Sequence, residues 1–412
     1  MLTHALQSGA AQICNFNMYS NYKTFYFFLS LILATRLFFV YINNFKINYI
    51  DGYVITYPNV KSHYQIISLN NYKVILPSSV KVDIGDRVYI EKGPARNNYI
   101  YYPRFNIKET FMSQLMKYPA DIRCSYLKSV KSYYVSNHAA LISSLTLGEV
   151  ADISYENYLE IRDSGLLHIF AVSGYNFSLV TMPIILFMRK NKSAILSLVA
   201  LFISILYLLL VGLEPSVLRA FFMLTVFIIY RLANRNGNIF IYYLVSLFLS
   251  VIVFPFYLYK IGFYLSYIAT LAVILGIKLK CKNIVHKAIF INFIVFLFTF
   301  PLILYFFNKI NVLSFLGSYI ITLTLPVIYF LILFDYIFRI NISEGVLYYF
   351  LDFIYLIAKL SPRVFLDTSE YHVLSFVIVW TVVVLGTTVA KWVMHLLYCH
   401  LRSKEVKGLR GG

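Results

Sequence analysis

The stretch Ser193–Gly212, SAILSLVALFISILYLLLVG, contains no formally charged residue over 20 positions. A helix rises about 1.5 Å per residue, so a block of this length matches a hydrocarbon core of about 30 Å. Similar blocks recur at 236–259, 311–334 and 371–390. Repeated blocks of this kind predict a polytopic α-helical membrane protein.

The composition agrees with this class. Of the 412 residues, 60% are hydrophobic and 13% are charged, and the mean hydropathy is +0.71. A soluble chain has about 45–50% apolar and about 25% charged residues, so a disordered chain is excluded and a water-soluble globule is disfavoured. The formal net charge of +18 is attributed first to Lys and Arg in cytoplasmic loops rather than to nucleic-acid binding.

About ten spans are predicted. Thr24–Ile42 is interpreted as an uncleaved anchor, and the later spans are 164–188, 193–212, 216–230, 236–259, 261–277, 288–307, 311–334, 341–360 and 371–390. Every other loop is rich in cations, which predicts that both termini are cytoplasmic. The weakest span is 341–360, because it contains Glu344, Asp352 and Lys359; the alternative is a helix in the membrane interface.

The segment between the first two spans differs in kind. Alternating apolar and polar positions predict strands over 49–57, 64–76 and 80–91, with turns at Asn70-Asn71 and Gly85-Asp86. These elements predict a small extracytoplasmic β-barrel within 43–110. An amphipathic helical connector is expected over 111–163. Its first part carries cations spaced along one face, as an interfacial helix would: Lys117, Arg123, Lys128 and Lys131.

The run Gly165–Asn176, GLLHIFAVSGYN, places polar residues inside an apolar block. On one continuous helix, Gly165, His168, Ser173 and Asn176 would share an arc of about 140°. Such side chains are expected to face protein or water rather than lipid. The alternative is hydrogen bonding between helices, with small residues allowing close approach.

A second polar run is Gly212–Ala220, GLEPSVLRA. Pro215 suits the first turn of a helix, which places Arg219 about one turn into the next span. An arginine there costs about 2.5–3.5 kcal/mol on insertion scales, so it needs a partner or water. Two alternatives stay open: the side chain extends to the headgroups, or it faces inward as a bidentate donor for phosphate.

Several ordered motifs resemble the ComEC-type competence proteins. They are Leu147-Gly148, Gly165-Leu-Leu-His168, Ala171-Val-Ser173-Gly174, Glu214-Pro-Ser-Val-Leu-Arg219-Ala220 and Gly262-Phe-Tyr-Leu-Ser266-Tyr, with Gly85-Asp86-Arg87-Val88 matching the family's G-D-x-V motif. The resemblance implies the anchor 24–42, an OB-like domain 43–110 and a multi-span competence domain 164–399. The loop charges place segment 1–23 and the basic tail 400–412 in the cytoplasm. The resemblance also implies an inner-membrane channel for single-stranded DNA in natural transformation.

The chain departs from the family at two points. Many members carry His two positions after the Ser-Gly pair, where this chain has Asn176, which cannot titrate near neutrality. Many also carry a C-terminal metallo-β-lactamase-like domain, and this chain shows no HxHxDH cluster. No phosphate-loop motif or metal-ligand spacing occurs either. We therefore expect no cofactor, no metal and no enzymatic activity, with energy supplied by a partner motor or by trapping of the strand on the cytoplasmic side.

The resulting hypothesis is that the protein contains a water-filled path through which single-stranded DNA, a polyanion, crosses the membrane. The path is lined or braced by His168, Ser173, Gly174, Asn176, Ser216 and Arg219. The β-domain is expected to receive the strand through Lys61, Lys73, Arg87, Lys92, Arg96, Tyr72 and Tyr89, or else to form a collar without DNA contact. Implied partners are the bilayer, a DNA receptor, an ATP-driven helicase-like motor and a competence pilus. Whether the protein forms a homo-oligomer stays open.

Two rival functions belong to other classes. One is transport of a smaller anionic solute, because polar spans alone do not name the cargo. The other is an intramembrane serine protease that uses Ser173 and His168. On one regular helix these two residues would point about 140° apart, too far for a nucleophile–base contact.

Overall fold

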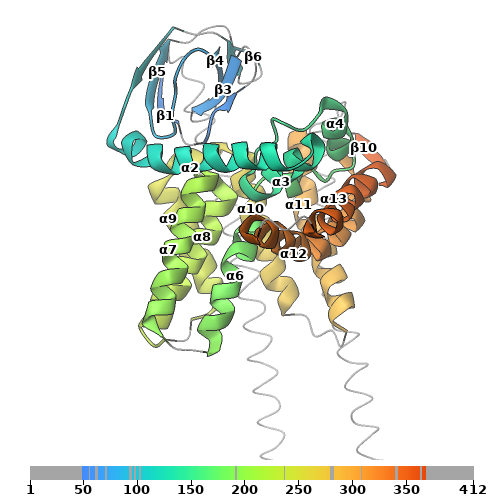
Figure 1. The fold of residues 1–412 in the computed structure, drawn as a ribbon. Coiled ribbons are helices and arrows are strands. Elements are labelled where there is room, and N and C mark those ends of the chain that lie inside the picture. Colours follow the sequence, from blue (N-terminus) through green and yellow to red (C-terminus); the bar gives the residue numbers. More distant parts are fainter. Residues whose placement is uncertain are drawn as a thin grey trace, which may run out of the picture.

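The computed structural model describes residues 49–367, with gaps at 55, 61–63, 70–71, 92–94, 97–98, 102–103, 191–192, 236, 279–282, 308, 339–341 and 362–363. The expected anchor 24–42 and last span 371–390 lie outside the described residues, as do segments 1–23 and 400–412. Figure 1 shows a β-domain above a helical body, with helix α2 lying across the top of that body.

The β-domain consists of two sheets. Strands β1 (Tyr49–Tyr53), β5 (Arg87–Glu91) and β8 (Phe105–Lys108) form an antiparallel sheet in the order β1-β5-β8. The second sheet has the order β2-β3-β4-β7-β6 and consists of β2 (Asn59–Val60), β3 (Tyr64–Leu69), β4 (Tyr72–Pro77), β7 (Tyr99–Tyr101) and β6 (Ala95–Arg96). Apolar side chains from both sheets form one core, as their period-2 pattern requires.

The expected segments are divided at the expected turns. Strand β3 ends at Leu69 and β4 begins at Tyr72, on either side of 70–71, and the two pair antiparallel. Gly85 has a φ of +93° and forms a turn before β5 begins, as expected, but residues 80–84 are not a strand. The β-domain itself is present, while its closure into an OB-type barrel stays a prediction.

The G-D-x-V turn fastens the β-domain to helix α2 (Phe111–Tyr133). The Thr110 hydroxyl donates to the Gly85 carbonyl at 2.7 Å and also accepts the Ser113 N–H, closing a capping box. The buried Asp86 carboxylate accepts the N–H of Asp83 at 2.8 Å. This motif therefore acts as a structural joint between the sheet and α2.

The connector continues through α3 (Ser136–Leu147) and α4 (Tyr155–Asp163) into a broken segment. A continuous helix over 164–188 was wrong. Gly165 has a φ of +78°, α5 covers only Leu167–Phe170, and α6 begins afresh at Gly174. The Ser173 hydroxyl accepts the N–H groups of Tyr175 and Asn176 and so caps the new helix. The predicted polar arc of Gly165, His168, Ser173 and Asn176 assumed one continuous helix, so it does not hold. The separation of about 140° between Ser173 and His168, which argued against a protease, assumed the same helix and does not hold either.

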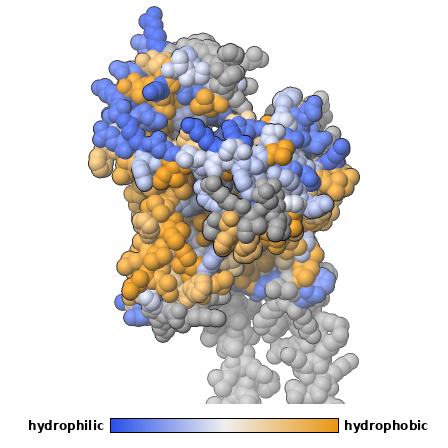
Figure 2. All heavy atoms as spheres, in the orientation of Figure 1, coloured by the Kyte–Doolittle hydropathy of each residue, from blue (hydrophilic) through white to orange (hydrophobic). Residues whose placement is uncertain are grey.

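The helical body follows the expected apolar blocks. Its helices are α6 (Gly174–Lys190), α7 (Ala194–Val211), α8 (Pro215–Leu232), α9 (Ile239–Val253), α10 (Ile261–Ile277) and α11 (Ile284–Phe307), with a 3₁₀ turn η1 at Pro255–Tyr259. Within the described part of the chain, four helices are long and apolar enough to cross a membrane: α7, α8, α11 and α12 (Ser314–Phe338). Figure 2 shows a hydrophobic band over the body below a hydrophilic upper part. The protein is a polytopic helical membrane protein on these grounds.

Helix α13 (Ile342–Leu360) packs against α3, α4 and α12. Its buried face is apolar, and Asp352 pairs with His138 of α3 at 2.8 Å. After the end of α13, strand β10 (Phe365–Asp367) pairs with β9 (Lys309–Asn311), which precedes α12. Among the described helices, α13 is not one of the four long and apolar enough to cross a membrane, and both alternatives for 341–360 stay open.

Candidate functional site

The two polar runs meet where α8 begins. Pro215 occupies the first turn of α8, as expected, so the next residue points its side chain at the neighbouring break. The Ser216 hydroxyl donates to the Val172 carbonyl at 2.7 Å. That carbonyl is unpaired within a helix because the chain is broken between α5 and α6. Ser216 therefore satisfies the break and fixes α8 against it.

Arg219 lies one turn further along α8 and contacts α10. One guanidinium nitrogen, Nη1, donates to the Ser266 carbonyl at 2.5 Å and to the Thr270 hydroxyl. Both acceptors are neutral oxygens. The buried Nε has no hydrogen-bond partner among the residues that the structure describes. The arginine is therefore held inside the protein as a cation rather than extended to the headgroups.

Gly174 leaves the space that this arginine occupies. A β-carbon at position 174 would overlap the guanidinium, whose Nη2 lies directly against it. The φ of Gly174 is not positive, so the close approach and not the backbone conformation requires glycine here. Three of the motifs therefore meet at one place, which we call the junction. They are the motifs at 171–174, 214–220 and 262–267.

Ser173 and Asn176 face the protein interior at the same junction. The Asn176 amide donates to the Leu145 carbonyl of α3 at 3.1 Å and accepts the Ser173 hydroxyl at 3.2 Å. Asn176 is 1% exposed. These contacts brace the first turn of α6 against the last turn of α3.

His168 points elsewhere. Its ring is exposed, with Nδ1 3.0 Å from the Gly165 carbonyl and Nε2 3.5 Å from the Ser318 hydroxyl of α12. On the same side, the Tyr175 hydroxyl donates to the Thr322 carbonyl at 3.0 Å, one turn further along α12. His168 therefore belongs to a second polar group, which faces α12.

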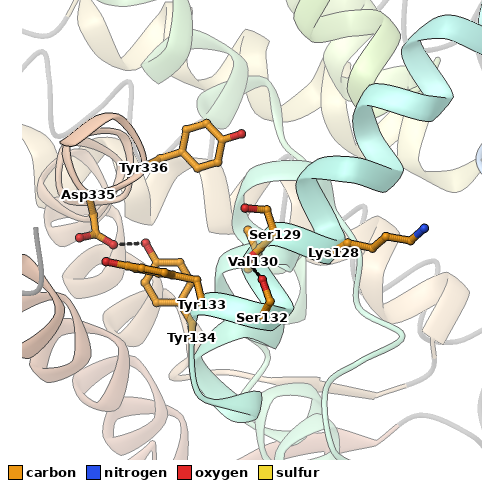
Figure 3. Close-up of a pocket in the computed structure, with 8 residues that line it drawn as sticks. All are labelled: Lys128, Ser129, Val130, Ser132, Tyr133, Tyr134, Asp335 and Tyr336. Carbon is orange, nitrogen blue, oxygen red and sulfur yellow. Dashed lines mark hydrogen bonds between the residues drawn. The ribbon is translucent and has the colours of Figure 1, made fainter. Parts of the chain in front are cut away.

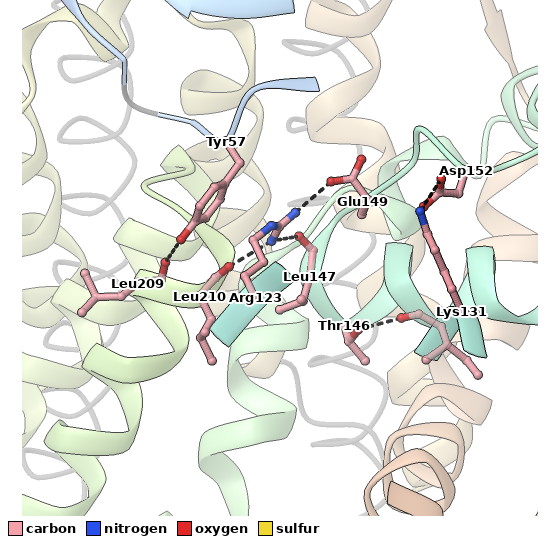
Figure 4. A network of polar contacts seen from close by, with 10 residues as sticks. Tyr57, Arg123, Lys131, Thr146, Leu147, Glu149, Asp152, Leu209 and Leu210 are labelled. Carbon is pink, nitrogen blue, oxygen red and sulfur yellow. Dashed lines mark hydrogen bonds and ion pairs between the residues drawn. The ribbon is translucent and has the colours of Figure 1, made fainter. Parts of the chain in front are cut away.

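Arg123 is a further polar centre; it was predicted on the cationic face of an interfacial helix, and the structure buries it instead. It is 6% exposed, and its Nη1 donates to the carbonyls of Leu147 at 3.0 Å and Leu210 at 2.9 Å, which end α3 and α7 (Figure 4). Its Nη2 pairs with Glu149 at 3.1 Å. A cation at two helix C-termini is favourable because carbonyl dipoles converge there. Glu149, two residues after α3, is the acidic residue in the sequence that could have pointed to a buried partner for Arg123.

Tyr57 connects the β-domain to the same centre. Its ring lies 4.4 Å from the Arg123 guanidinium, and its hydroxyl donates to the Leu209 carbonyl at 2.8 Å. Burial raises the pKa of Tyr57 to about 12, although the Arg123 charge acts in the opposite direction. The β-domain is therefore fixed to the end of α7, next to the loop that leads into α8.

The β-domain residues expected to bind DNA do not form one group. Lys61 and Lys92 lie outside the described residues, and Tyr72 and Arg96 lie on β4 and β6. Lys73 is exposed on β4 of the five-stranded sheet. Arg87 and Tyr89 are exposed on β5 of the other sheet. The shared core separates these two exposed faces.

A cavity between α2 and α12 contains none of the expected site residues. Figure 3 shows the Tyr134 hydroxyl bonded to the buried Asp335, with Tyr133 and Tyr336 beside them, while the Lys128 side chain points away from this pair. Among the residues that the structure describes, no group of three or more His, Cys, Asp or Glu is arranged to hold a metal ion.

Comparisons with known proteins match the part of the chain that contains this junction. The family model described as "Competence protein" matches residues 145–398, more than half of the chain. The chain belongs to the competence protein family. ComE operon protein 3 of Bacillus subtilis (strain 168) is 24% identical to it over 233 residues. That alignment covers 53% of this chain but 30% of the relative's length. No solved structure matches.

Proposed function

We propose that this competence protein conducts single-stranded DNA across the bacterial inner membrane during DNA uptake. The observation that carries the proposal is the partly buried cation of Arg219, whose guanidinium donates to two neutral oxygens, the Ser266 carbonyl and the Thr270 hydroxyl. Single-stranded DNA carries about one negative charge per nucleotide, and bare hydrocarbon excludes charge. A fixed cation at a junction of broken helices lowers that barrier.

The polar residues divide into two tasks. The side chains of three residues form hydrogen bonds with backbone carbonyls or with one another: Ser173, Asn176 and Ser216. These residues therefore stabilise the junction. His168 and Tyr175 keep exposed surface, and Tyr175 is 38% exposed. These two, with Ser318 and Thr322 of α12, supply donors and acceptors along a path between α5, α6 and α12. Arg219 lies against Gly174 at the start of α6 and contacts α10, on the other side of the break between α5 and α6.

The orientation follows from the loop charges. Gly212, just before α8, lies against Tyr57 of the β-domain. Arg231 ends α8, and Arg235 follows it. If the cations at that end are cytoplasmic, the β-domain is extracytoplasmic and both termini are cytoplasmic. The expected division into 24–42, 43–110, 111–163 and 164–399 is kept as part of this proposal.

Energy for the transfer comes from outside the chain. A DNA receptor and a competence pilus would deliver the strand, and an ATP-driven helicase-like motor would pull it inward. On this proposal the described part of the chain acts as a channel.

The test is entry of labelled DNA into the cytoplasm of a strain that lacks the protein. Wild-type protein is expected to restore entry, while Arg219→Leu inserts into the membrane but does not restore it. Arg219→Lys is expected to restore it in part, because an ammonium keeps the charge but not the planar fork. Arg235→Gln, on the loop after α8, is the matched control and is expected to behave as wild type. Normal entry in the deletion strain would refute the proposal.

The second candidate is a transporter of a smaller anionic solute, since Arg219 would attract that cargo by the same charge. Intact DNA entry in the deletion strain, together with loss of uptake of one small anion, would favour it.

A further inference from the structure

The outer face of the three-stranded sheet carries a regular arrangement of rings and cations. Tyr53 of β1 pairs with Arg87 of β5, and Arg87 pairs with Lys108 of β8, so the three form one cross-strand row. In the next outward row, Tyr89 lies between Asp51 and Asn106. The intervening Val88 and Ile90 are fully buried, which fixes the direction in which these rows point.

The side chains of these rows are open to solvent. Tyr53 is 48% exposed and Tyr89 is 44% exposed, and the Arg87 guanidinium lies 5.9 Å from the Tyr53 ring centroid. Arg104, just before β8, has a side chain that is 91% exposed and lies 3.9 Å from Glu91. The face thus holds two rings and three cations, with Glu91 and the register position of Asp51 as its acids.

The two tyrosines are diagonal neighbours on adjacent strands. Positions related in this way are about 7–8 Å apart, so both rings come within reach of successive bases of one extended strand. A basic surface with exposed rings is the arrangement that binds single-stranded nucleic acid without sequence preference, because every base has a stacking face. A duplex keeps its bases stacked on one another and cannot use the rings in this way.

We propose that this outer face, Tyr53, Arg87, Tyr89, Arg104 and Lys108, is a binding site for single-stranded DNA. Bases stack on the two tyrosines, and phosphates pair with the three cations. The proposal rests on the proposed function for its ligand and adds Tyr53, Arg104 and Lys108 to what the sequence had suggested. It leaves out Lys73, which lies on the other sheet. In Figure 1, β1 and β5 lie at the outer left side of the β-domain, and Figure 2 shows hydrophilic surface there.

The test uses the full-length protein in nanodiscs and a labelled oligothymidine of about 15 nucleotides. Tyr53→Ser and Tyr89→Ser are each expected to weaken binding about tenfold, the loss that follows from one unstacked base. Arg87→Gln and Lys108→Gln are each expected to reduce the slope of log affinity against log salt by about 0.7. The matched controls are Lys73→Gln and Tyr155→Ser, which change an exposed lysine on the other sheet and an exposed tyrosine on α4.

Unchanged binding in the four face variants would overturn the assignment, as would equal losses in the two controls. A duplex that competes as well as oligothymidine would overturn it too, because stacking on the rings needs free bases. The proposed function fails separately: it falls if DNA entry is normal in the deletion strain, whatever the binding result. It stands if Arg219→Leu blocks entry while the face variants bind normally.

Discussion

Arg219 on α8 lies directly against Gly174 at the start of α6, in the space that a β-carbon would fill. The contact joins two runs of sequence that are more than 40 positions apart. It also explains why a small residue follows Ser173, whose side chain already caps α6. The guanidinium of Arg219 can therefore occupy this position only if residue 174 has no side chain.

Gly174→Ala is expected to abolish DNA entry while leaving the protein in the membrane. Where the backbone allows it, replacing glycine by alanine usually stabilises by about 0.4–1 kcal/mol. Here the added methyl group displaces the guanidinium from Ser266 and Thr270. The control is Gly262→Ala on α10, where a β-carbon meets no atom within 4 Å. Wild-type entry with Gly174→Ala would show that the arginine's position is not needed.

Arg123→Met is expected to destabilise the protein by about 3–5 kcal/mol, because it leaves a partly buried carboxylate and two helix-end carbonyls without their donor. Lys131→Met is the matched control on the same helix. Its ion pair with Asp152 is exposed, so its loss is expected to cost about 0–1 kcal/mol. Thermal unfolding in detergent compares the two variants. Equal melting temperatures would contradict the role given to Arg123.

The contrast between these two residues shows what the sequence could and could not reveal. Lys117, Arg123, Lys128 and Lys131 recur at helical spacing, which predicted α2 correctly. Spacing does not tell which of the four meets the ends of α3 and α7, since that depends on how distant elements pack. Arg123 was therefore predicted to face the headgroups, and this was wrong because its guanidinium is buried against two carbonyls and Glu149.

Polar residues inside apolar blocks were more informative. Ser216 and Arg219 stood out because a polar group in a membrane must find a partner, and each found one in the structure. The chain break before α6 was missed, although Ser173-Gly174 is a usual start for a helix. Hydropathy is insensitive to such a break because Ala171 and Val172 are as apolar as the helix around them.

Tyr57→Phe is expected to change how stability depends on pH. Burial raises the pKa of Tyr57 to about 12 from an ordinary value of 10.0, so between these values the folded protein keeps a proton that the unfolded chain loses. The free energy of unfolding therefore falls as pH rises through that interval. Phenylalanine removes this contribution while keeping the ring against Arg123. The fall in melting temperature above pH 10.0 is expected to be smaller in the variant than in wild type. Parallel curves would contradict the buried environment of the hydroxyl.

Cys124 provides a test of orientation in the native protein. It is a free, exposed thiol on α2, which lies beneath the β-domain and is extracytoplasmic on the proposed orientation. The other cysteines, Cys14, Cys281 and Cys399, lie in segments predicted to be cytoplasmic. A membrane-impermeant maleimide added to intact cells is therefore expected to label wild-type protein, and Cys124→Ser is expected to remove that label. Because lysed cells expose both sides, labelling of Cys124→Ser after lysis confirms that the remaining thiols react. Labelling of that variant in intact cells would place a predicted cytoplasmic loop or terminus outside, and the assignment of the β-domain to the outer face would then be wrong.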